Sequence, residues 1–574
     1  MRQGKWLLLF TFSLALQASY GQQSESEGNK AEIHGNFSLD GQYYRPDEAI
    51  SAVVPDEQTA LQGFGNIIYT QGKFEAGMRF ETYVPAFVGY PAGAPWSGTG
   101  VGMRYAAYHA DNISITVGNF YEQFGSGMVL RTWEDRGLGV DYALDGLRVV
   151  ARPKRGVTLK GLYGRQRRSF NNGIVYSNGL VRGLDAEINL NDVLDSVFVI
   201  PGQLTIGGSF VSKFESDRDP IYQFPENVDA VSVRFNYLIG GFNAGAEYAR
   251  IGINPTRFNS GILDIPANLD PSVGLFQYGQ GFNANMGYSR KGLGVGLTAN
   301  SLSNMAFQSE RDELTGFDSW INFLPPTSVL QTALLAQFYP YATQPNGEVA
   351  IRADFFYTFK KKSTIGGKYG TKLDLSYTQV NAPDYPMVGD FDLNRRGIEP
   401  ALFRPSDRVY YADFTARISK KLSPKFKGSL MYMNIVYDND VIQGAYDYDD
   451  VPTRGVIYGN LYMVEGNWTI KRGHNLRFEL QVLTTDQHLQ DWFAAIVEYT
   501  ASPHWFISAI NQYNYGNADG QLYNFPVLAT GYIKDSHRIM LSYGRQRAGV
   551  FCVGGVCRVV PASNGLTIGI TSSF

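Results

Sequence analysis

The segment GNFYEQFGSGMVLRTWEDRGLGVDYALDGLRV (118–149) concentrates side chains that could bind or steer a polar solute. Acids and bases are interspersed with glycines, so the segment can fold back and pair its charges with neighbouring elements. Its charged candidates are Glu122, Arg131, Glu134, Asp135, Arg136, Asp141 and Asp145. A surface loop whose ions pair with one another is the alternative, and such pairs contribute little individually. FGSG is no phosphate loop, because the Lys-Ser/Thr continuation is missing.

An acidic segment, YDNDVIQGAYDYDDVP (437–452), is a second candidate for binding chemistry. Carboxylates suit Ca²⁺, which takes about six to eight oxygen ligands. Asp447, Asp449 and Asp450 would be the ligands, but their spacing matches no defined calcium loop. A solvated acidic loop is the simpler interpretation, and we expect no firm metal site.

Cys552 and Cys557, in FCVGGVC, are the only two cysteines of the chain. The VGGV spacer can bend enough to join them, and disulfides persist in extracellular loops. We predict a disulfide that stiffens its loop locally and has no catalytic role.

Catalytic signatures are absent from the sequence. It holds no HExxH, no GxSxG and no paired zinc ligands. The six histidines fall at expected strand ends or turns, and only His488 falls on the extracellular side. We therefore expect neither an enzyme nor a cofactor. The net charge of −3 provides no basic field for nucleic acid.

Strands must position these candidates, because apolar and polar residues alternate in runs throughout the chain. Examples are DAVSVRFNYL (229–238), EVAIRADFFYTF (348–359), YYADFTARIS (410–419) and NLRFELQVL (475–483). Such alternation gives a strand one oily and one polar face. Runs of about 9 to 13 residues exceed the usual soluble strand and match tilted strands that cross a membrane. A water-soluble sandwich is the alternative.

The expected connections alternate between tight turns, such as IGGF (239–242) and KRGH (471–474), and long segments, such as 304–347. Short periplasmic turns and long extracellular loops are typical of outer-membrane barrels. We therefore predict an all-β fold, a transmembrane antiparallel up-and-down β-barrel of about 24 strands, within about two strands either way. Two stretches, 128–133 and 328–338, fit either a strand or a loop element.

The N-terminal sequence is typical of a secretory signal peptide, with basic Arg2 and Lys5 before a short apolar run. We predict a signal peptide over 1–21, a short periplasmic segment over 22–32 and the barrel over 33–574. A membrane anchor is disfavoured, because the apolar run is too short to span a bilayer.

The last strand, GLTIGITSSF, places Leu566, Ile568, Ile570 and Phe574 on one face. We expect it to pair with the first strand and close the barrel. A C-terminal strand ending in Phe resembles the insertion signal of outer-membrane β-barrel proteins, which the barrel-assembly machinery reads. The 118–149 segment resembles part of the large outer-membrane barrels of Bacteroidota called DUF6029-type proteins. This resemblance implies a Gram-negative outer membrane and carries no catalytic residue to this chain.

A barrel of this size has a lumen too wide for inward side chains alone to fill. We therefore predict that the charged segment forms an in-folding loop around 122–145 that constricts or plugs the lumen. Its ions would pair with lumen residues such as Arg352 and Arg417.

Three strands repeat a Tyr-x-Arg pattern that places arginines on the lipid-facing side, just beyond the apolar part. A guanidinium at headgroup depth can bind phosphate bidentately, so Arg165, Arg250 and Arg545 are candidates for contact with lipopolysaccharide. Pairing of these arginines with loop carboxylates is the alternative, because a bulge at a neighbouring Gly would reverse the parity.

Two functions fit these features. The first is a channel or transporter for small polar solutes with a loop-constricted lumen. The second is a structural barrel within an outer-membrane assembly, export or surface-protein complex. A TonB-dependent receptor fits poorly, because only a short segment precedes the first strand. The expected partners are outer-membrane lipid, lipopolysaccharide, the assembly machinery and proteins of such a complex.

Overall fold

The computed structural model describes 30–90, 96–194, 199–220, 222–256, 276–311, 319–324, 326–329, 331–386, 399–443, 455–517, 520, 523–553 and 556–574, without the side chains of 551–558. The predicted signal peptide, 1–21, lies outside the described residues, as does nearly all of the predicted periplasmic segment.

Within these residues, 24 strands form one sheet in which neighbours along the chain pair antiparallel. In chain order they are β1 (Ala31–Tyr44), β2 (Thr59–Gln71), β3 (Phe74–Tyr83), β4 (Trp96–His109), β5 (Ile113–Phe120), β10 (Leu144–Lys154), β11 (Val157–Asn171), β12 (Ile174–Asn189), β13 (Gln203–Phe214), β14 (Asn227–Ile239), β15 (Phe242–Ile251), β16 (Gly279–Arg290), β17 (Leu293–Ser303), β18 (Gly347–Phe359), β19 (Thr371–Pro383), β20 (Pro405–Lys421), β21 (Phe426–Asp438), β22 (Val456–Lys471), β23 (His474–Thr484), β24 (Trp492–Ala501), β25 (Trp505–Asn514), β26 (Tyr523–Lys534), β27 (His537–Gln546) and β30 (Ser563–Ser573).

Short elements lie in the connections between these strands. They are η1 (Glu48–Ile50), β6 (Gln123–Phe124), β7 (Leu130–Arg131), β8 (Glu134–Asp135), β9 (Val140–Asp141), α2 (Leu190–Leu194), η3 (Ala336–Phe338), α3 (Asn439–Ile442), β28 (Gly549–Val553) and β29 (Val556–Val560). No helix among the described residues is long and apolar enough to cross a membrane.

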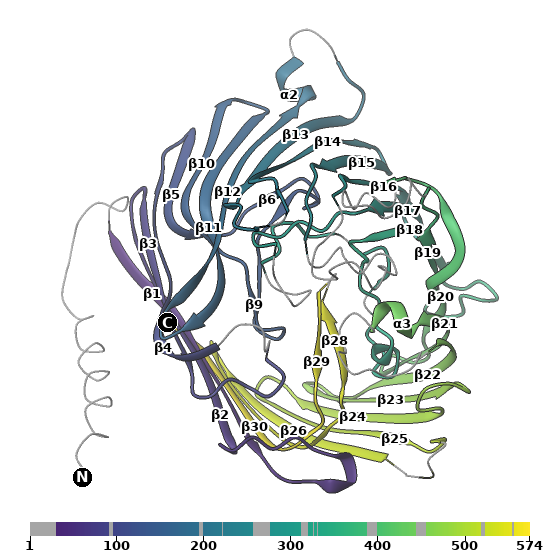
Figure 1. The fold of residues 1–574 in the computed structure, drawn as a ribbon. Coiled ribbons are helices and arrows are strands. Elements are labelled where there is room, and N and C mark those ends of the chain that lie inside the picture. Colours follow the sequence, from purple (N-terminus) through teal and green to yellow (C-terminus); the bar gives the residue numbers. More distant parts are fainter. Residues whose placement is uncertain are drawn as a thin grey trace, which may run out of the picture.

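The sheet closes because β30 pairs with both β27 and β1. At the seam, Phe574 and Gly35 exchange two backbone hydrogen bonds of 3.0 Å. The view along the axis shows the resulting ring of strands (Figure 1). The predicted antiparallel barrel and its strand number are confirmed.

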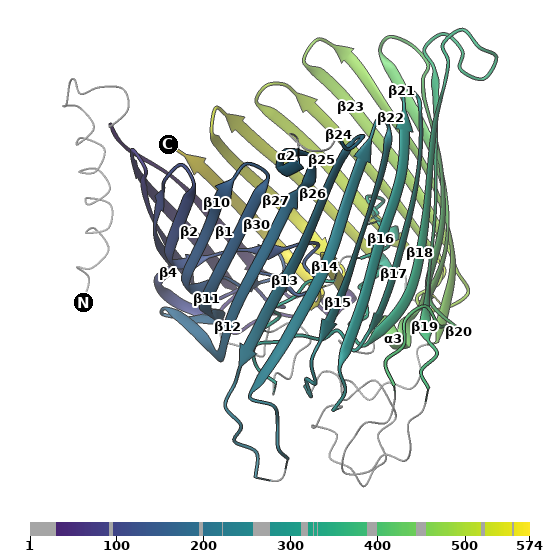
Figure 2. The ribbon, with the colours of Figure 1, turned by 90° about the horizontal axis from the view of Figure 1, so that it is seen from above.

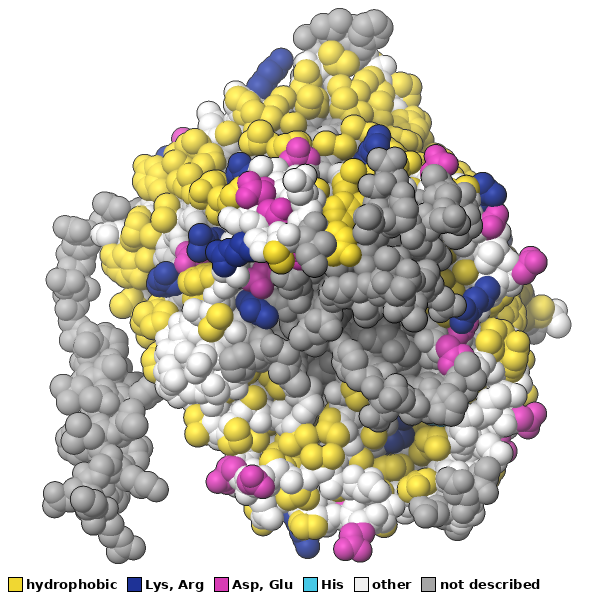
Figure 3. Space-filling view, in the orientation of Figure 1, with side chains coloured by type: hydrophobic (Ala, Val, Ile, Leu, Met, Phe, Trp, Pro, Cys, Tyr) yellow, Lys and Arg dark blue, Asp and Glu magenta, His cyan; other side chains and the backbone are white. Residues whose placement is uncertain are grey.

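The alternation of apolar and polar residues places the apolar face outward. On β14, Val231, Val233 and Phe235 are exposed on the outside of the wall, whereas Arg234 between them is buried on the inside. This arrangement is the reverse of a soluble protein and is expected of strands surrounded by lipid. Hydrophobic side chains accordingly gather along the upper and left parts of the outer edge of the barrel (Figure 3).

The connections differ at the two ends of the barrel, as the side view shows (Figure 2). One end carries mostly tight turns, in which Gly240 and Gly473 adopt positive φ values of 56° and 80°. This backbone conformation suits glycine, which has no Cβ to clash. The other end carries the long loops. In a bilayer the tight turns would face the periplasm.

The wall is interrupted at the long-loop end between β4 and β11. β5 stops at Phe120 and its partner β10 begins only at Leu144. Beyond this point β4 and β11 approach one another and pair directly, Trp96 with Phe170 and Ser97 with Asn171. The chain between β5 and β10 therefore has no place in the wall.

Candidate functional site: the plugged lumen

Two long connections turn inward. We call residues 121–143 inner loop 1 and residues 304–346, described without 312–318, 325 and 330, inner loop 2; together they are the plug. β6 and β9 of inner loop 1 lie inside the ring of strands, as does the β28–β29 hairpin (Figure 1). The two stretches that fitted either strand or loop, 128–133 and 328–338, both belong to the plug and not to the wall.

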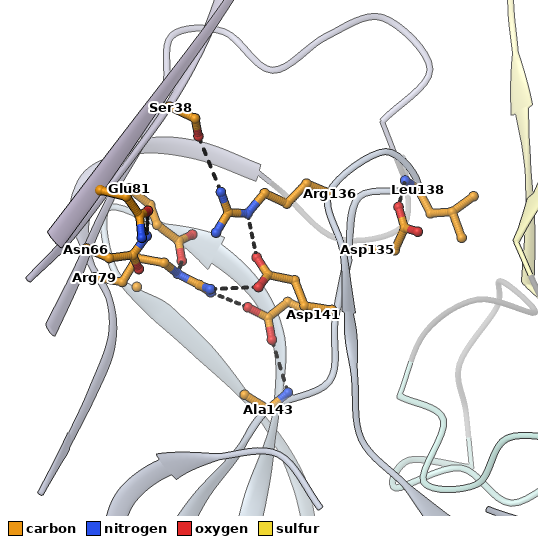
Figure 4. Close-up of polar contacts among 12 residues, drawn as sticks. Ser38, Asn66, Arg79, Glu81, Asp135, Arg136, Leu138, Asp141 and Ala143 are labelled. Atoms are coloured by element: carbon orange, nitrogen blue, oxygen red, sulfur yellow. Dashed lines mark hydrogen bonds and ion pairs between the residues drawn. The ribbon is translucent and has the colours of Figure 1, made fainter. Parts of the chain in front are cut away.

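Inner loop 1 is joined to the wall by a buried ion cluster of Arg79, Glu81, Glu134, Asp141 and Arg167. Figure 4 shows Arg79, Glu81 and Asp141 of this cluster. Arg79 of β3 donates to Glu81 over 2.6 Å, to Glu134 over 2.9 Å, and also to Asp141. Arg167 of β11 donates to Asp141 over 2.9 Å and to both Glu81 oxygens over 2.8 and 2.7 Å.

Burial makes this pairing obligatory. The side chains of Arg79, Glu81, Asp141 and Arg167 are all no more than 4% exposed. A charge so far from water is tolerated only when it is paired and hydrogen-bonded. Removing inner loop 1 would leave two arginines facing one carboxylate, so the wall and the loop depend on each other.

Further polar contacts surround the cluster. Arg136 donates to Glu134 over 2.8 Å and to Ser38 of β1 over 3.3 Å, and its guanidinium lies 4.0 Å from the Phe64 ring. Tyr121 donates to Asp141 over 2.8 Å, and burial raises the pKa of Tyr121, so it remains a donor. Asp135 does not touch the wall but accepts a hydrogen bond from the backbone of Leu138 within the loop.

Glu122 forms a second ionic contact between loop and wall. It accepts hydrogen bonds from Arg148 of β10 over 2.6 Å and from Lys160 of β11 over 2.7 Å. Burial opposes ionisation of this carboxyl group, but the two cations and a backbone N–H outweigh it and lower the pKa of Glu122. Charged side chains gather on this sector, near the labels of β11 and β12 (Figure 3).

Apolar packing holds the rest of inner loop 1. Phe124, Met128, Val129 and Leu130 are fully buried in a core with inward side chains of β11–β15 and with residues of inner loop 2. Arg131 lies 4.1 Å from the Phe323 ring and 5.9 Å from the Trp133 ring. Burial lowers the pKa of Arg131.

The later part of inner loop 2, from residue 333 onward, packs against the opposite part of the wall. Leu335, Phe338 and Tyr339 are buried with inward side chains of β18–β24, including Tyr437 and Trp492. The Phe338 and Trp492 rings meet edge to face at 4.8 Å, and the Leu335 backbone donates to Gln481 over 2.8 Å. The lumen thus contains apolar cores of the kind found inside a soluble domain.

A cavity of about 530 Å³ remains between the plug and the wall. Its wall side belongs to β25, β26, β27, β30 and β1, and its plug side includes Gly137 of inner loop 1 and Phe338 of inner loop 2. Polar lining residues are Gln42, Gln337, Gln512, Ser542, Arg545, Gln546, Arg547, Ser563 and Thr567. The cavity is large enough for a small solute.

A family model described as "Family of unknown function (DUF6029)" matches residues 1–574. The chain belongs to the DUF6029 family. No curated protein matches its sequence.

Several solved barrels resemble the DUF6029 chain in structure at low sequence identity. A mutant of the ferric enterobactin receptor PfeA from Pseudomonas aeruginosa aligns over 96% of this chain and 82% of its own, with 9% identity and a TM-score of 0.40. OccAB4 from Acinetobacter baumannii aligns over 96% and 100%, with 8% identity and a TM-score of 0.32. The translocation pore of the P pilus usher PapC aligns over 95% and 99%, with 7% identity and a TM-score of 0.38.

The structure corrects the expected partners of inner loop 1 in this DUF6029 chain. Arg352 pairs with Asp354 over 2.6 Å, on its own strand, and Arg417 pairs with Glu465 of β22. Neither reaches inner loop 1, because both lie on strands across the lumen from it. Arg352 does approach the plug, since it donates to the Thr327 carbonyl of inner loop 2 over 3.5 Å.

Asp145 is also separated from the lumen. Asp145 lies on the same face of β10 as Leu147, which is exposed on the outside of the barrel. Arg148 lies on the other face and contacts Glu122. Asp145 accepts hydrogen bonds from Arg104 over 3.2 Å and from Tyr176. The end of the predicted in-folding segment, 144–145, therefore belongs to the wall.

The candidate lipopolysaccharide arginines occupy three different environments. Arg165 is exposed beside exposed Tyr163, and Arg250 lies 4.5 Å from the Tyr278 ring. Arg545 instead pairs with Asp47, in the connection between β1 and β2, over 2.6 and 3.0 Å. Arg545 thus follows the alternative of pairing with a loop carboxylate.

The remaining candidates are the acidic segment, the two cysteines and His488. Asp447, Asp449 and Asp450 lie outside the described residues, and within the described part no group of three His, Cys, Asp or Glu side chains could hold a metal. The β28–β29 register places Cys552 opposite Cys557, but their side chains are outside the described set, so the disulfide stays a prediction. His488 lies 3.4 Å from the Tyr339 hydroxyl, against the plug.

Proposed function

We propose that this DUF6029 barrel lies in the outer membrane and passes small polar solutes through a lumen constricted by its two inner loops. The observation that carries the proposal is the cavity of about 530 Å³ between plug and wall, with its amide and hydroxyl lining. A sealed structural barrel would not need a polar cavity on the inner side of an otherwise packed plug.

The outward apolar surface supports the membrane location. Exposed Val233 on β14, Leu297 on β17 and Leu430 on β21 are 63%, 47% and 57% exposed, and they belong to different sectors of the wall. Their transfer into lipid is favourable, whereas in water such a surface would drive aggregation.

A second function, a structural barrel within an outer-membrane complex, is favoured by a different observation. Both inner loops are packed in apolar cores with fully buried side chains such as Phe307, Leu335 and Ile435. A plug packed this well opens only at the cost of exposing these cores, which suits a barrel that stays closed.

Conductance of the purified protein in planar bilayers distinguishes the two functions. The informative variant lacks residues 126–142 and carries Arg79→Gln, so that Glu81 and Arg167 remain as a balanced pair in the wall. Arg79→Gln alone, with the loop intact, is the matched control. The channel proposal expects discrete openings from the unmodified barrel and a larger conductance from the deletion variant.

A silent unmodified barrel beside a conducting deletion variant would overturn the channel proposal, because it would show a lumen sealed by the plug. Stoichiometric co-purification with other outer-membrane proteins would then favour the structural function. Equal conductance of the deletion variant and its control would mean that inner loop 1 does not limit passage.

A further inference from the structure

Arg547 is placed differently from the other lumen arginines. It follows β27 directly, where the chain turns inward, and it lines the cavity between plug and wall. Its guanidinium carbon lies 3.7 Å from the centre of the Phe338 ring, in η3 of inner loop 2. Stacking on an aromatic face fixes the plane of a guanidinium and leaves its N–H edge available.

The position of Arg547 also depends on a glycine. A Cβ added to Gly549 would lie 2.9 Å from both terminal nitrogens of Arg547. The guanidinium therefore lies directly over the backbone of β28, between that backbone and the Phe338 ring. These two contacts hold the group at one place in the cavity.

No carboxylate among the described residues pairs with Arg547. Arg545, two positions earlier, pairs with Asp47, and Arg79 and Arg167 pair within the buried ion cluster. The neighbouring Tyr339 is neutral at physiological pH, since burial raises its pKa to about 12. The other polar groups of the described cavity lining are amides, hydroxyls and the guanidinium of Arg545, with no acid among them.

Arg547 nevertheless carries its charge at neutral pH. Burial lowers its pKa to about 10, which is still well above physiological pH. A half-buried guanidinium with no carboxylate partner among the described residues creates a local preference for an anion.

We propose that Arg547 is the anion-binding site of the lumen and takes the carboxylate or phosphate group of a small solute. The inference rests on the proposed channel function and narrows its substrate class to organic or inorganic oxyanions. The guanidinium edge offers two parallel N–H donors to two oxygens, which matches the geometry of a carboxylate or phosphate group. Chloride is a single atom and cannot form this bidentate contact. The surrounding glutamines and hydroxyls can contact the polar remainder of the solute.

Reversal potentials of single barrels in a KCl gradient measure the charge preference. The unmodified barrel should prefer anions, Arg547→Gln should reduce the anion-to-cation permeability ratio about tenfold, and Arg547→Glu should invert it. Arg131→Gln is the matched control, because Arg131 also stacks on aromatic rings in the plug but does not line the cavity. Added succinate or inorganic phosphate should block the chloride current of the unmodified barrel and not that of Arg547→Gln.

A second readout separates failure of this inference from failure of the channel function. Isothermal titration of the detergent-purified, heat-modifiable barrel with succinate or with inorganic phosphate should give binding that Arg547→Gln loses and Arg131→Gln keeps. If no protein conducts but this binding pattern is seen, the site stands and the channel function fails. A conducting barrel with no anion preference, or binding unchanged by Arg547→Gln, would overturn the inference.

Discussion

Arg167 of β11 donates to Asp141 of inner loop 1 over 2.9 Å, while the same guanidinium binds both carboxylate oxygens of Glu81 on β3. One side chain thus joins two distant strands of the wall to the plug. This contact lies beyond Phe120 and Leu144, where the β5–β10 pairing ends and β11 pairs with β4, so the interrupted wall and the in-folded loop are parts of one arrangement.

The first prediction concerns Asp141. Asp141→Asn keeps the shape of the side chain but removes the negative charge that pairs with both Arg79 and Arg167. Unbalancing a buried ion pair costs about 3 to 5 kcal/mol, so the variant should unfold at a clearly lower temperature, and amides of 121–143 should exchange faster. Asp145→Asn is the control, because its partner Arg104 is 55% exposed and the pair should contribute about 0 to 1 kcal/mol. Equal stability losses in the two variants would contradict a structural role for the cluster.

The second prediction is a pH dependence that arises from Glu122. Its pKa in the folded protein is below the ordinary value of 4.5, so its contacts with Arg148 and Lys160 stabilise the fold fully above that value. This stabilisation is lost as the pH falls through the lowered pKa, where the carboxyl group becomes protonated.

Thermal unfolding of the wild-type protein and of Glu122→Gln should therefore differ at pH 7 and converge in acid below the ordinary pKa. Asp111→Asn is the comparison, since Asp111 pairs with Lys73 at an exposed turn and should change the midpoint little at any pH. A difference between wild type and Glu122→Gln that persists undiminished in acid would show that the charge of Glu122 is not what stabilises the loop.

The wall could be predicted from the sequence because its signal is local. Val231, Val233 and Phe235 alternate with polar residues, and this period determines which side chains share a face of the strand. The plug contacts could not be found in this way. Arg79, Glu81 and Arg167 look like any inward charges of a barrel strand, and their pairing with Asp141 depends on where the distant chain turns inward.

Inner loop 2 did carry a usable signal. The stretch SVLQTALLAQF (328–338), which fitted either a strand or a loop element, is more apolar than an exposed loop would be. An interior position explains this apolar composition, since Leu335 and Phe338 are buried. The position of Arg547 could not be predicted in this way, because the residues around it in the sequence do not indicate a contact with the Phe338 ring.

The third prediction concerns the seam of the barrel. Phe574 is 68% exposed on the outside, yet its backbone forms both hydrogen bonds with Gly35 that extend the β30–β1 pair. Deleting Phe574 should therefore reduce the fraction of heat-modifiable, protease-resistant barrel in the outer membrane and leave more chain in the periplasm. Ser573→Asn keeps the terminal aromatic and the pairing, and it should insert normally. Normal insertion of the deletion variant would show that the closing strand needs no terminal aromatic residue.

The last prediction separates Arg165, Arg250 and Arg545 by their partners. Arg165 is exposed near the end of the apolar face of β11, at the depth where an outward arginine costs little and lipid phosphates are within reach. We propose that Arg165 and Arg250 contact lipopolysaccharide, whereas Arg545 serves the contact with Asp47. Arg165→Gln and Arg250→Gln should lower the thermal stability of the barrel in lipopolysaccharide-containing membranes and leave it unchanged in a neutral detergent. Arg545→Gln should lower it equally in both, because Asp47 is present in both. A loss for Arg165→Gln that is as large in detergent as in lipopolysaccharide would instead assign Arg165 to a protein contact.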